Sequence, residues 1–510
     1  MASDESNANA TPSAGRRTAA VFGNPMPQAV IRKAQAQKAG FMKRFGAEGA
    51  GLAGREGLAL LENPVLGPRF GIKTLALPGE AGAAASFDPE AGAVVGTIRM
   101  GYGHYRIAMA AASALRHRGR TPYWFDLNGF VDSLGGRVVA RLNELYSLGS
   151  RLSQRYKLFD RLYWEPLNSE GFKKLSYNAV DQSMAELFAP LYASIPRELP
   201  FVATHAWPAQ GAVHAGLSRV VNMIPDNWPM ALHLAEGATH VVQGPSAYMG
   251  YRALRDMAGR GLSKPLPASS IRMGGHFIDH EIVAGLADDT QARVGRLDRG
   301  EAKRILFSLG GAGAQLEYLA SLVRGVLPLV EEGKAALYLN FGDHATSWER
   351  FERELFAPGT RWEALLTRHV GDWAEAAAFA EAAREGKGSA FEGVHAFLNA
   401  DKFAAVYATN LLMRASDLLV TKPSELAYYP VPKLMIKRVG GHERWGAIRA
   451  AELGDGSYEL ESVEAAMQML GLMIEERDLL TLQNECITRN ARAGIYDGAY
   501  KVVDLALDRA

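Results

Sequence analysis

A segment near residue 100 has the pattern of a strand, a glycine-containing turn, a helix and a second strand. The apolar run at residues 93–98 predicts the first strand, and residues 99–106 form the turn. A helical stretch follows and ends at Gly119, before a second apolar run at residues 122–127. Strands that alternate with helices in this way are typical of βαβ units, which build parallel sheets.

The same pattern returns about 200 residues later. Here the strand is at residues 304–309, the turn at 310–314, the helix at 316–327 and the next strand at 335–340. Two such units so far apart predict two similar domains in tandem and not a short-period repeat. A chain of 510 residues also has room for two hydrophobic cores, since a single core seldom grows past about 300 residues. We therefore predict an α/β protein with two Rossmann-like domains that face each other across a cleft.

A polar, charged stretch at residues 288–304 separates the two units and sets the domain boundary. Further apolar runs predict more strands, at residues 201–204, 220–224 and 240–242 in the first domain and at 418–421 and 433–436 in the second. The predicted order is a tail and basic helical extension (1–80), an N-terminal domain (81–285), a C-terminal domain (300–460) and final helices that pack back on the N-terminal domain (461–510).

The extension begins with a polar tail at residues 3–17, which has little to bury and is predicted to be disordered. Residues 27–61 are helical and basic. This helix either packs on the next domain or binds an anionic surface. A net charge of +1 gives no support for a nucleic-acid partner, and the single cysteine, Cys486, cannot form an internal disulfide. The chain shows neither a membrane span nor a signal peptide, so we expect a cytoplasmic protein.

The glycine-rich turn at residues 310–314 has the composition of a phosphate-binding turn. Without side chains in the way, the backbone of such a turn approaches an anion closely, and the N-terminus of the following helix attracts negative charge. A tight turn with a purely structural role would have the same sequence.

The turn of the first domain places His104 at the start of a helix. The helix dipole disfavours the imidazolium there and keeps the ring neutral and basic. The histidine could instead cap the helix or bind a backbone carbonyl.

A third candidate segment follows the strand at residues 418–421. Its loop carries Lys422, Ser424 and Glu425 at the carboxyl edge of the predicted sheet, where open α/β sheets bind ligands. A lysine there can neutralise a phosphate, and a carboxylate can accept hydrogen bonds from both ribose hydroxyls. A solvated surface loop is the alternative.

These three segments, in this order, resemble the motifs of glycosyltransferases of the GT-B fold. The resemblance is nearest to the group of monogalactosyldiacylglycerol synthases and MurG-type N-acetylglucosaminyltransferases. It extends from about residue 94 to 460 and includes the segments 201–205, 221–229 and 243–246. Two features depart from the family. Tyr102 stands where the family has a glycine, and the loop from Lys422 to Glu425 is short and lacks glycine.

The resemblance implies transfer of a sugar, with inversion, from a nucleotide diphosphate sugar to an acceptor hydroxyl, without a strict need for a metal. Uridine is the family's usual nucleotide. The implied general base is His104 or Asp226. On the donor side the implied residues are Gly310, Gly311, Ala312, Gly313, Lys422, Ser424 and Glu425, with Glu443 as an alternative to Glu425. On the acceptor side they are Gly101, Tyr102, Gly103, His205 and Trp228.

The acceptor is the least determined part of this prediction. The basic helix at 27–61 and the Tyr-, Arg- and Lys-rich region at 146–163 lie where the family's membrane-facing members contact lipid, which implies a lipid acceptor at the inner face of a membrane. A nucleotide-sugar 2-epimerase of the same fold and an inactive nucleotide-sugar-binding protein are the alternatives. His205, His214 and His233 lack the spacing of a zinc site, so we predict no metal.

Overall fold

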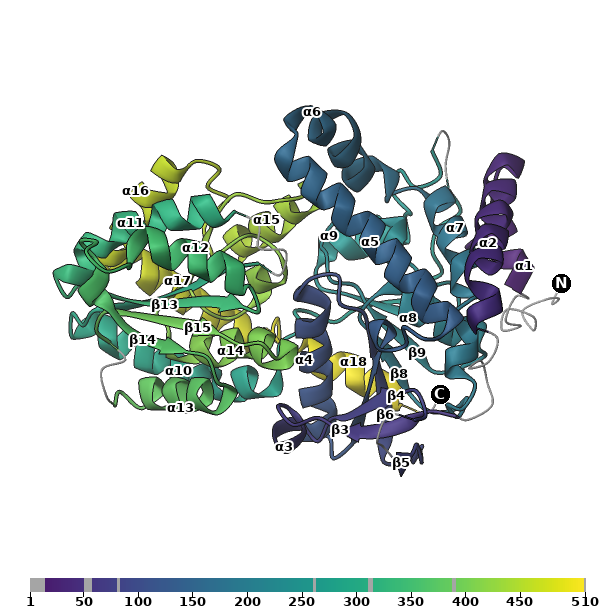
Figure 1. Cartoon of the computed structure of the whole chain (residues 1–510), viewed down its shortest axis with the longest axis horizontal. Coiled ribbons are helices and arrows are strands. Elements are labelled where there is room, and N and C mark those ends of the chain that lie inside the picture. The colour runs from purple at the N-terminus through teal and green to yellow at the C-terminus, as the bar shows by residue number, and fades with distance from the viewer. Residues whose placement is uncertain are drawn as a thin grey trace.

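The structure is a computed structural model that describes residues 14–49, 57–79, 83–259, 263–310, 315–387 and 391–508. It contains two parallel-sheet domains that lie side by side (Figure 1). Residues 14–17, which we expected to be disordered, belong to a short helix, α1 (Ala14–Ala19). The rest of that predicted tail lies outside the described residues.

The first domain is built on a nine-stranded sheet in the order β11-β10-β9-β8-β6-β7-β4-β3-β5. From β11 to β4 neighbouring strands are parallel, whereas β3 pairs antiparallel with both β4 and β5. The strands are β3 (Ala59–Glu62), β4 (Lys73–Ala76), β5 (Ala83–Ala84), β6 (Gly92–Thr97), β7 (Thr121–Asp126), β8 (Phe201–Ala203), β9 (Val220–Met223), β10 (Thr239–Val242) and β11 (Ile271–Met273).

The first sheet begins before residue 81, where we placed the start of the domain. The strands β3 and β4 extend the sheet beyond β7, so residues 59–76 belong to the first domain and not to a helical extension. The basic helix itself is α2 (Gln28–Gly49), and it ends before residue 61 because the chain turns there into the edge strands. It packs on α7 (Leu175–Ala185) and α5 (Leu134–Arg155) of the same domain.

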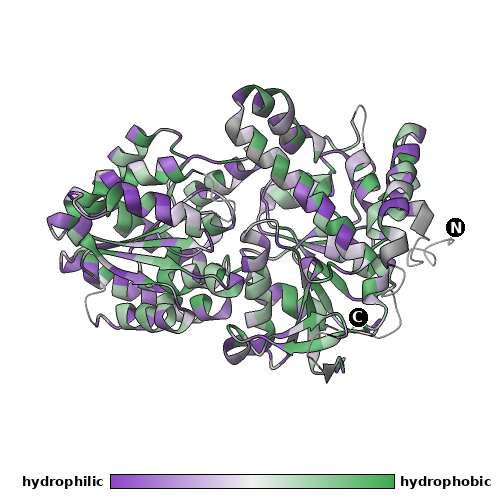
Figure 2. Ribbon diagram, viewed as in Figure 1, coloured by the Kyte–Doolittle hydropathy of each residue, from purple (hydrophilic) through white to green (hydrophobic). Residues whose placement is uncertain are grey.

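The second domain has a six-stranded sheet, parallel throughout, in the order β14-β15-β13-β12-β16-β17. Apolar residues dominate its central strands and are buried on both faces, as a covered parallel sheet requires (Figure 2). The strands are β12 (Lys303–Ser308), β13 (Ala335–Gly342), β14 (Leu366–Val370), β15 (Val394–Leu398), β16 (Leu418–Thr421) and β17 (Lys433–Met435).

Helices cover both sheets. Those of the first domain are α3 (Gly67–Phe70), α4 (Gly103–His117), α8 (Ala206–His214) and α9 (Pro245–Arg252), besides α2, α5 and α7. Those from residue 280 onward are α10 (His280–Asp298), α11 (Leu316–Glu331), α12 (Ala345–Leu355), α13 (Trp373–Arg384), α14 (Lys402–Ala415), α15 (Arg444–Leu453), α16 (Val463–Glu475), α17 (Asp478–Arg492) and α18 (Gly498–Leu507). None of the helices within the described ranges is long and apolar enough to cross a membrane.

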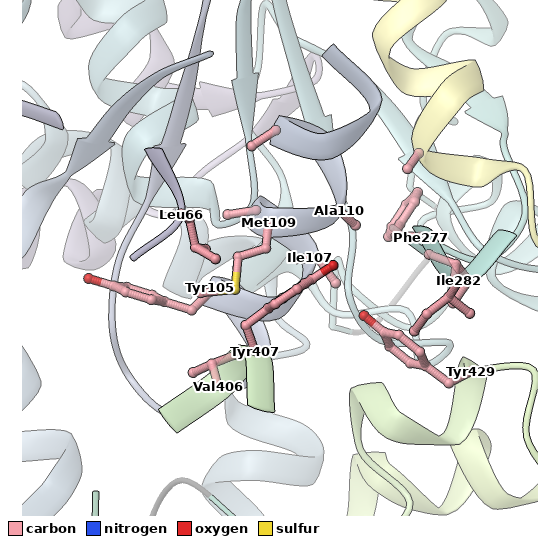
Figure 3. Close-up of a cluster of buried hydrophobic side chains, with 14 of the residues drawn as sticks. Leu66, Tyr105, Ile107, Met109, Ala110, Phe277, Ile282, Val406, Tyr407 and Tyr429 are labelled. Carbon is pink, nitrogen blue, oxygen red and sulfur yellow. The ribbon is translucent and has the colours of Figure 1, made fainter. Parts of the chain in front are cut away.

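One hydrophobic cluster joins the two domains. Helix α4 of the first domain contributes Tyr105, Ile107 and Met109, and α14 of the second contributes Val406 and Tyr407 (Figure 3). A shared apolar core of this kind resists separation of the domains, because opening the contact would expose apolar surface to water.

The C-terminal helices divide between the domains. Only α18 packs back on the first domain, against α4, and Arg118 forms an ion pair with Asp504 there (Figure 1). In contrast, α16 packs on α11 and α17 packs on α10, so residues 463–492 do not cover the N-terminal domain as we predicted. The predicted fold class, an α/β protein of two Rossmann-like domains with C-terminal helices, is confirmed.

Candidate functional site

The carboxyl edges of the two sheets face each other. In each sheet the chain order reverses beside the first βαβ strand, between β6 and β8 in the first domain and between β12 and β16 in the second. Open α/β sheets bind ligands just outside the carboxyl ends of such strands. The predicted site residues follow these four strands or the neighbouring β9 and β17, so the fold brings both sets to one interface.

Gly103 and Glu425 lie against each other across this interface. Gly103 opens helix α4, and a Cβ placed on it would lie 1.6 Å from Oε1 of Glu425. The carboxylate therefore lies at the positive N-terminal end of α4, where negative charge is stabilised. We predicted Glu425 as a donor-side residue and Gly103 as an acceptor-side residue. The structure places them in direct contact.

Tyr102, the residue that departs from the family's glycine, also reaches the second domain. Its hydroxyl donates to Oδ1 of Asp343 and accepts from the Asp343 backbone N–H at 2.8 Å. Arg99 forms an ion pair with the same carboxylate. The tyrosine ring lies so close to Gly342 that a Cβ there would fall 2.2 Å from the hydroxyl. Tyr102 thus binds the residue that follows β13 in the second domain.

His104 is held in one orientation by the first domain. Its Nδ1 lies 2.7 Å from the carbonyl oxygen of Thr204, so Nδ1 carries the proton and donates it. Its Nε2 makes no hydrogen bond to any residue that the structure describes. Burial lowers the pKa of His104 below its ordinary value, against the opposing effects of Glu425 and the Thr204 carbonyl. The ring is therefore neutral near pH 7, with a free lone pair.

His205 has a structural part in the site. Its Nδ1 accepts a hydrogen bond from the Trp207 N–H at 3.0 Å and so caps helix α8. Its ring lies edge-on to His104, with 4.9 Å between the ring centroids. Burial lowers the pKa of His205 well below its ordinary value, and the neighbouring His104 lowers it further.

Asp226 is paired with a histidine. Oδ2 of Asp226 lies 3.2 Å from Nε2 of His233, whose Nδ1 is 2.8 Å from the Tyr251 hydroxyl. Burial alone would raise the pKa of Asp226, but His442 and His233 lower it well below its ordinary value. A carboxylate held ionised in this way is a weak base. The geometry therefore favours His104 over Asp226 as the group that accepts a proton.

Trp228 belongs to a contact between aromatic rings from both domains. Its ring lies 5.3 Å from that of Trp445, at the start of α15, and Lys173 lies 5.0 Å above it. The indole N–H of Trp228 is buried without a hydrogen-bond partner among the residues described, as is Nδ1 of His442. These two polar atoms leave hydrogen bonds available beside Asp226.

The donor-side residues around Lys422 are also close together. Lys422 forms an ion pair with Glu443, and a Cβ on Gly310 would lie 3.2 Å from Cε of the lysine. Burial would lower the pKa of Lys422, but Glu443 and Glu425 raise it above its ordinary value. The lysine therefore stays charged beside the predicted phosphate turn. Gly311, Ala312 and Gly313 lie outside the described residues.

Ser424 and Glu443 have local partners. Ser424 precedes a 3-10 turn, η8 (Glu425–Tyr428), that carries Glu425 toward α4. Glu443 accepts a hydrogen bond from the Val439 N–H at 2.8 Å and so orders the loop before α15. Gly101 lies in open space, since a Cβ there would meet no atom within 4 Å.

Sequence reasoning missed several residues of this interface. His233 and His442 flank Asp226, Asp343 binds Tyr102, and the buried Arg106 donates to Asn410 across the domains. The position of Asp343 directly after β13 was a usable signal, because polar residues at strand ends collect at the ligand edge. Within the described ranges, no group of three or more His, Cys, Asp and Glu side chains is arranged to hold a metal ion.

Two family models match the chain. Residues 20–253 match a domain of unknown function, DUF6937, and residues 266–507 match another, DUF6938. Their junction falls between α9 and β11, so the last strand of the first sheet lies within the second match. No curated protein matches the sequence.

Solved structures resemble the chain at a distance. The UDP-GlcNAc 2-epimerase from Neisseria meningitidis bound to UDP-GlcNAc is 12% identical, with a TM-score of 0.42 over 81% of this chain and 98% of that one. The α,α-trehalose 6-phosphate synthase from Burkholderia multivorans is 12% identical, with a TM-score of 0.41 over 82% and 98%. The calicheamicin glycosyltransferase CalG4 is 12% identical, with a TM-score of 0.34 over 81% and 97%.

Proposed function

We propose that this protein transfers a sugar, with inversion, from a nucleotide diphosphate sugar to an acceptor hydroxyl. The observation that carries the proposal is the position of His104. A neutral imidazole with a free Nε2 lies at the start of α4, beside Glu425 of the second domain, while a charged lysine lies next to the turn after β12. A base and a cation on facing sheet edges are what glycosyl transfer requires.

In the proposed reaction, Nε2 of His104 takes the proton of the acceptor hydroxyl as its oxygen attacks the anomeric carbon. The bond from that carbon to the diphosphate oxygen breaks, and the electron pair leaves with the diphosphate. Lys422 and the backbone amides of the turn at 310–313 would stabilise this negative charge, so the proposal needs no metal ion. Asp226, held ionised by His233 and His442, would stabilise the positive charge that develops on the sugar.

We further propose uridine diphosphate as the nucleotide and a lipid hydroxyl as the acceptor, with the protein peripheral to a membrane. The support for these two details is the resemblance to monogalactosyldiacylglycerol synthases and MurG-type enzymes. Glu425 lies against the start of α4, whereas Glu443 forms an ion pair with Lys422. Of the two carboxylates, Glu443 is therefore the one that we propose as the donor-side residue beside Lys422.

A nucleotide-sugar 2-epimerase is the second candidate. The contact of Glu425 with Gly103 favours it, because this contact places a carboxylate where an acceptor hydroxyl would approach His104. In an epimerase, His104 and Glu425 would exchange protons with the sugar as acid and base, and no acceptor would be needed.

A screen of nucleotide diphosphate sugars by thermal shift would identify the donor, since a ligand that binds only the folded state raises its stability. The bound sugar would then be incubated with and without lipid acceptors, and products analysed by mass spectrometry. Transfer that depends on an acceptor supports the proposal, and a 2-epimer formed without acceptor supports the second candidate. His104→Ala and Lys422→Ala should both reduce turnover, whereas the exposed His369→Ala should not. Turnover unchanged in His104→Ala would refute the mechanism.

A further inference from the structure

A cluster of exposed apolar side chains lies on one arm of the first domain. We call the arm residues 145–171, from the second half of α5 through α6 (Lys157–Phe159) and the π-helical turns η2 (Asp160–Trp164) and η3 (Leu167–Gly171). Leu158 and Leu162, 71% and 68% exposed, are the most exposed large apolar side chains among the described residues. The cluster also includes Leu145, Leu148, Tyr156 and Tyr163.

The inner face of the arm is well packed. The Trp164 ring lies directly over Gly149, where a Cβ would fall 2.1 Å from it, and 5.2 Å from the ring of Tyr146. The buried Asn168 donates to the Trp164 carbonyl at 2.9 Å. The exposed residues are therefore not the surface of a poorly folded segment. They form the outer face of an ordered element, and α6 lies at an outer end of the molecule, away from both sheets (Figure 1).

The basic residues of the arm gather in its first part. The whole arm has four basic and three acidic residues, a net charge of +1, but residues 145–163 hold all four basic residues and only one acidic residue, a net charge of +3. Lys157 and Arg161 are exposed directly beside Leu158 and Leu162. Exposed apolar residues flanked by lysine and arginine match the interface of an anionic bilayer, where the apolar groups enter the acyl boundary and the cations meet the headgroups. A protein partner would be expected to need a wider and less charged patch.

The inner face of the same arm lies over the candidate site. A Cβ on Gly441, beside His442 and Glu443, would fall 2.2 Å from Oε1 of Glu165. Burial raises the pKa of Tyr146 to about 12, and the carboxylates of Glu443, Asp226 and Glu425 raise it in the same direction. One face of the arm therefore adjoins the site, while the other presents apolar and basic side chains to the surroundings.

We propose that the outer face of the arm docks on an anionic membrane surface and holds the site next to it. Its role in delivering an acceptor rests on the lipid acceptor proposed above, but the docking itself does not depend on any reaction.

Flotation of the full chain with vesicles tests the proposal. We expect binding to vesicles of phosphatidylglycerol and phosphatidylcholine, little binding to phosphatidylcholine alone, and release by 0.5 M salt. Leu158→Ser/Leu162→Ser and Lys157→Glu/Arg161→Glu should each reduce binding roughly tenfold or more. Leu472→Ser/Leu482→Ser, which alters exposed leucines of α16 and α17, is the matched control and should bind like the parent.

Three results would overturn docking on lipid. The first is flotation of the arm variants equal to that of the parent, and the second is equal binding of the parent to neutral vesicles. The third is a dimer of the parent by light scattering that Leu158→Ser/Leu162→Ser dissociates, which assigns the face to a second copy. If the parent floats as expected but transfers no sugar to any acceptor, the proposed function fails and the docking stands.

Discussion

Glu425 in the second domain lies against Gly103 in the first, so closely that a Cβ on the glycine would fall 1.6 Å from Oε1 of the carboxylate. The contact joins the loop after β16 to the first residue of α4, next to His104. Because the Glu425 carboxylate raises the pKa of His104, the protonation of this candidate base depends on the position of the second domain. The same domain holds Lys422.

A methyl group at Gly103 should displace Glu425 from the helix end. The obstructing atoms belong to the end of a flexible side chain, so we expect Gly103→Ala to fold with a loss of stability of about 1 kcal/mol or less. Its turnover should fall roughly tenfold or more, since the carboxylate no longer acts on His104. Gly101→Ala is the control, because a Cβ there meets no atom within 4 Å. Equal turnover in the two variants would show that the contact has no part in activity.

Tyr102→Phe should weaken the contact between the domains. It removes the hydroxyl that bonds both the side chain and the backbone N–H of Asp343, and a lost hydrogen bond to a charged group costs roughly 1.5–3 kcal/mol. We expect a lower free energy of unfolding in urea and a larger radius of gyration by small-angle scattering. Tyr105→Phe, whose hydroxyl binds Asp126 inside the first domain, should lower stability without a change in radius. A Tyr102→Phe radius equal to that of the parent would contradict this role.

His104 should set the acidic limb of the activity profile. Because burial lowers its pKa from 6.5, the imidazole becomes protonated, and inactive as a base, only below pH 6.5. We expect kcat/KM to be level near pH 7 and to fall on the acid side of 6.5. His104→Gln should lose activity about 10²–10⁴-fold and should lose this limb. If Asp226→Asn removes the limb and His104→Gln keeps it, the base is Asp226.

His240 should make the fold sensitive to acid. Its Nε2 accepts from the Ala235 N–H and its Nδ1 donates to the Ser270 carbonyl, so only the neutral ring fits. Burial lowers its pKa from 6.5 to about 4. As pH falls from 6.5 toward 4, the unfolded chain takes up a proton that the folded chain does not, and stability decreases. This histidine should lower the free energy of unfolding by about 2 kcal/mol between pH 7 and 5.

Urea unfolding at these two pH values measures this effect. His240→Gln should be less stable than the parent at pH 7, yet its free energy should change less between pH 7 and 5. The exposed His369→Gln should change with pH as the parent does. A pH dependence unaltered in His240→Gln would assign the acid sensitivity to other groups.

Much of the fold could be predicted from the sequence. The strands β6 and β12 are centred on short apolar runs and are followed by glycine-containing turns, and local patterns of this kind can be read without the tertiary context. The strands β3 and β4 were missed because each has four residues and they pair at the edge of the sheet, where a short run carries little periodicity. The helices α16 and α17 were assigned to the wrong domain, since an apolar helix face does not specify which surface covers it.

The sequence predicted which residues belong to the candidate site, but not which of them contact one another. The position of His104 at the start of a helix follows from the turn, and that of Lys422 from the strand before it. That Asp226 is paired with His233, and so held ionised, could not be predicted, because a pKa depends on neighbours that the fold brings close.

By itself the sequence determined two βαβ units, their phosphate-type turns and the strand ends on which the candidate residues lie. These features depend on residues near one another in the chain. Only the tertiary structure decided that Tyr102 meets Asp343, 241 positions away, and that Glu425 rests on Gly103. The packing of α4 on α14 and α18 fixes the orientation of the two sheets. No local sequence pattern encodes this orientation, and it brings the turns of the two domains together in one candidate site.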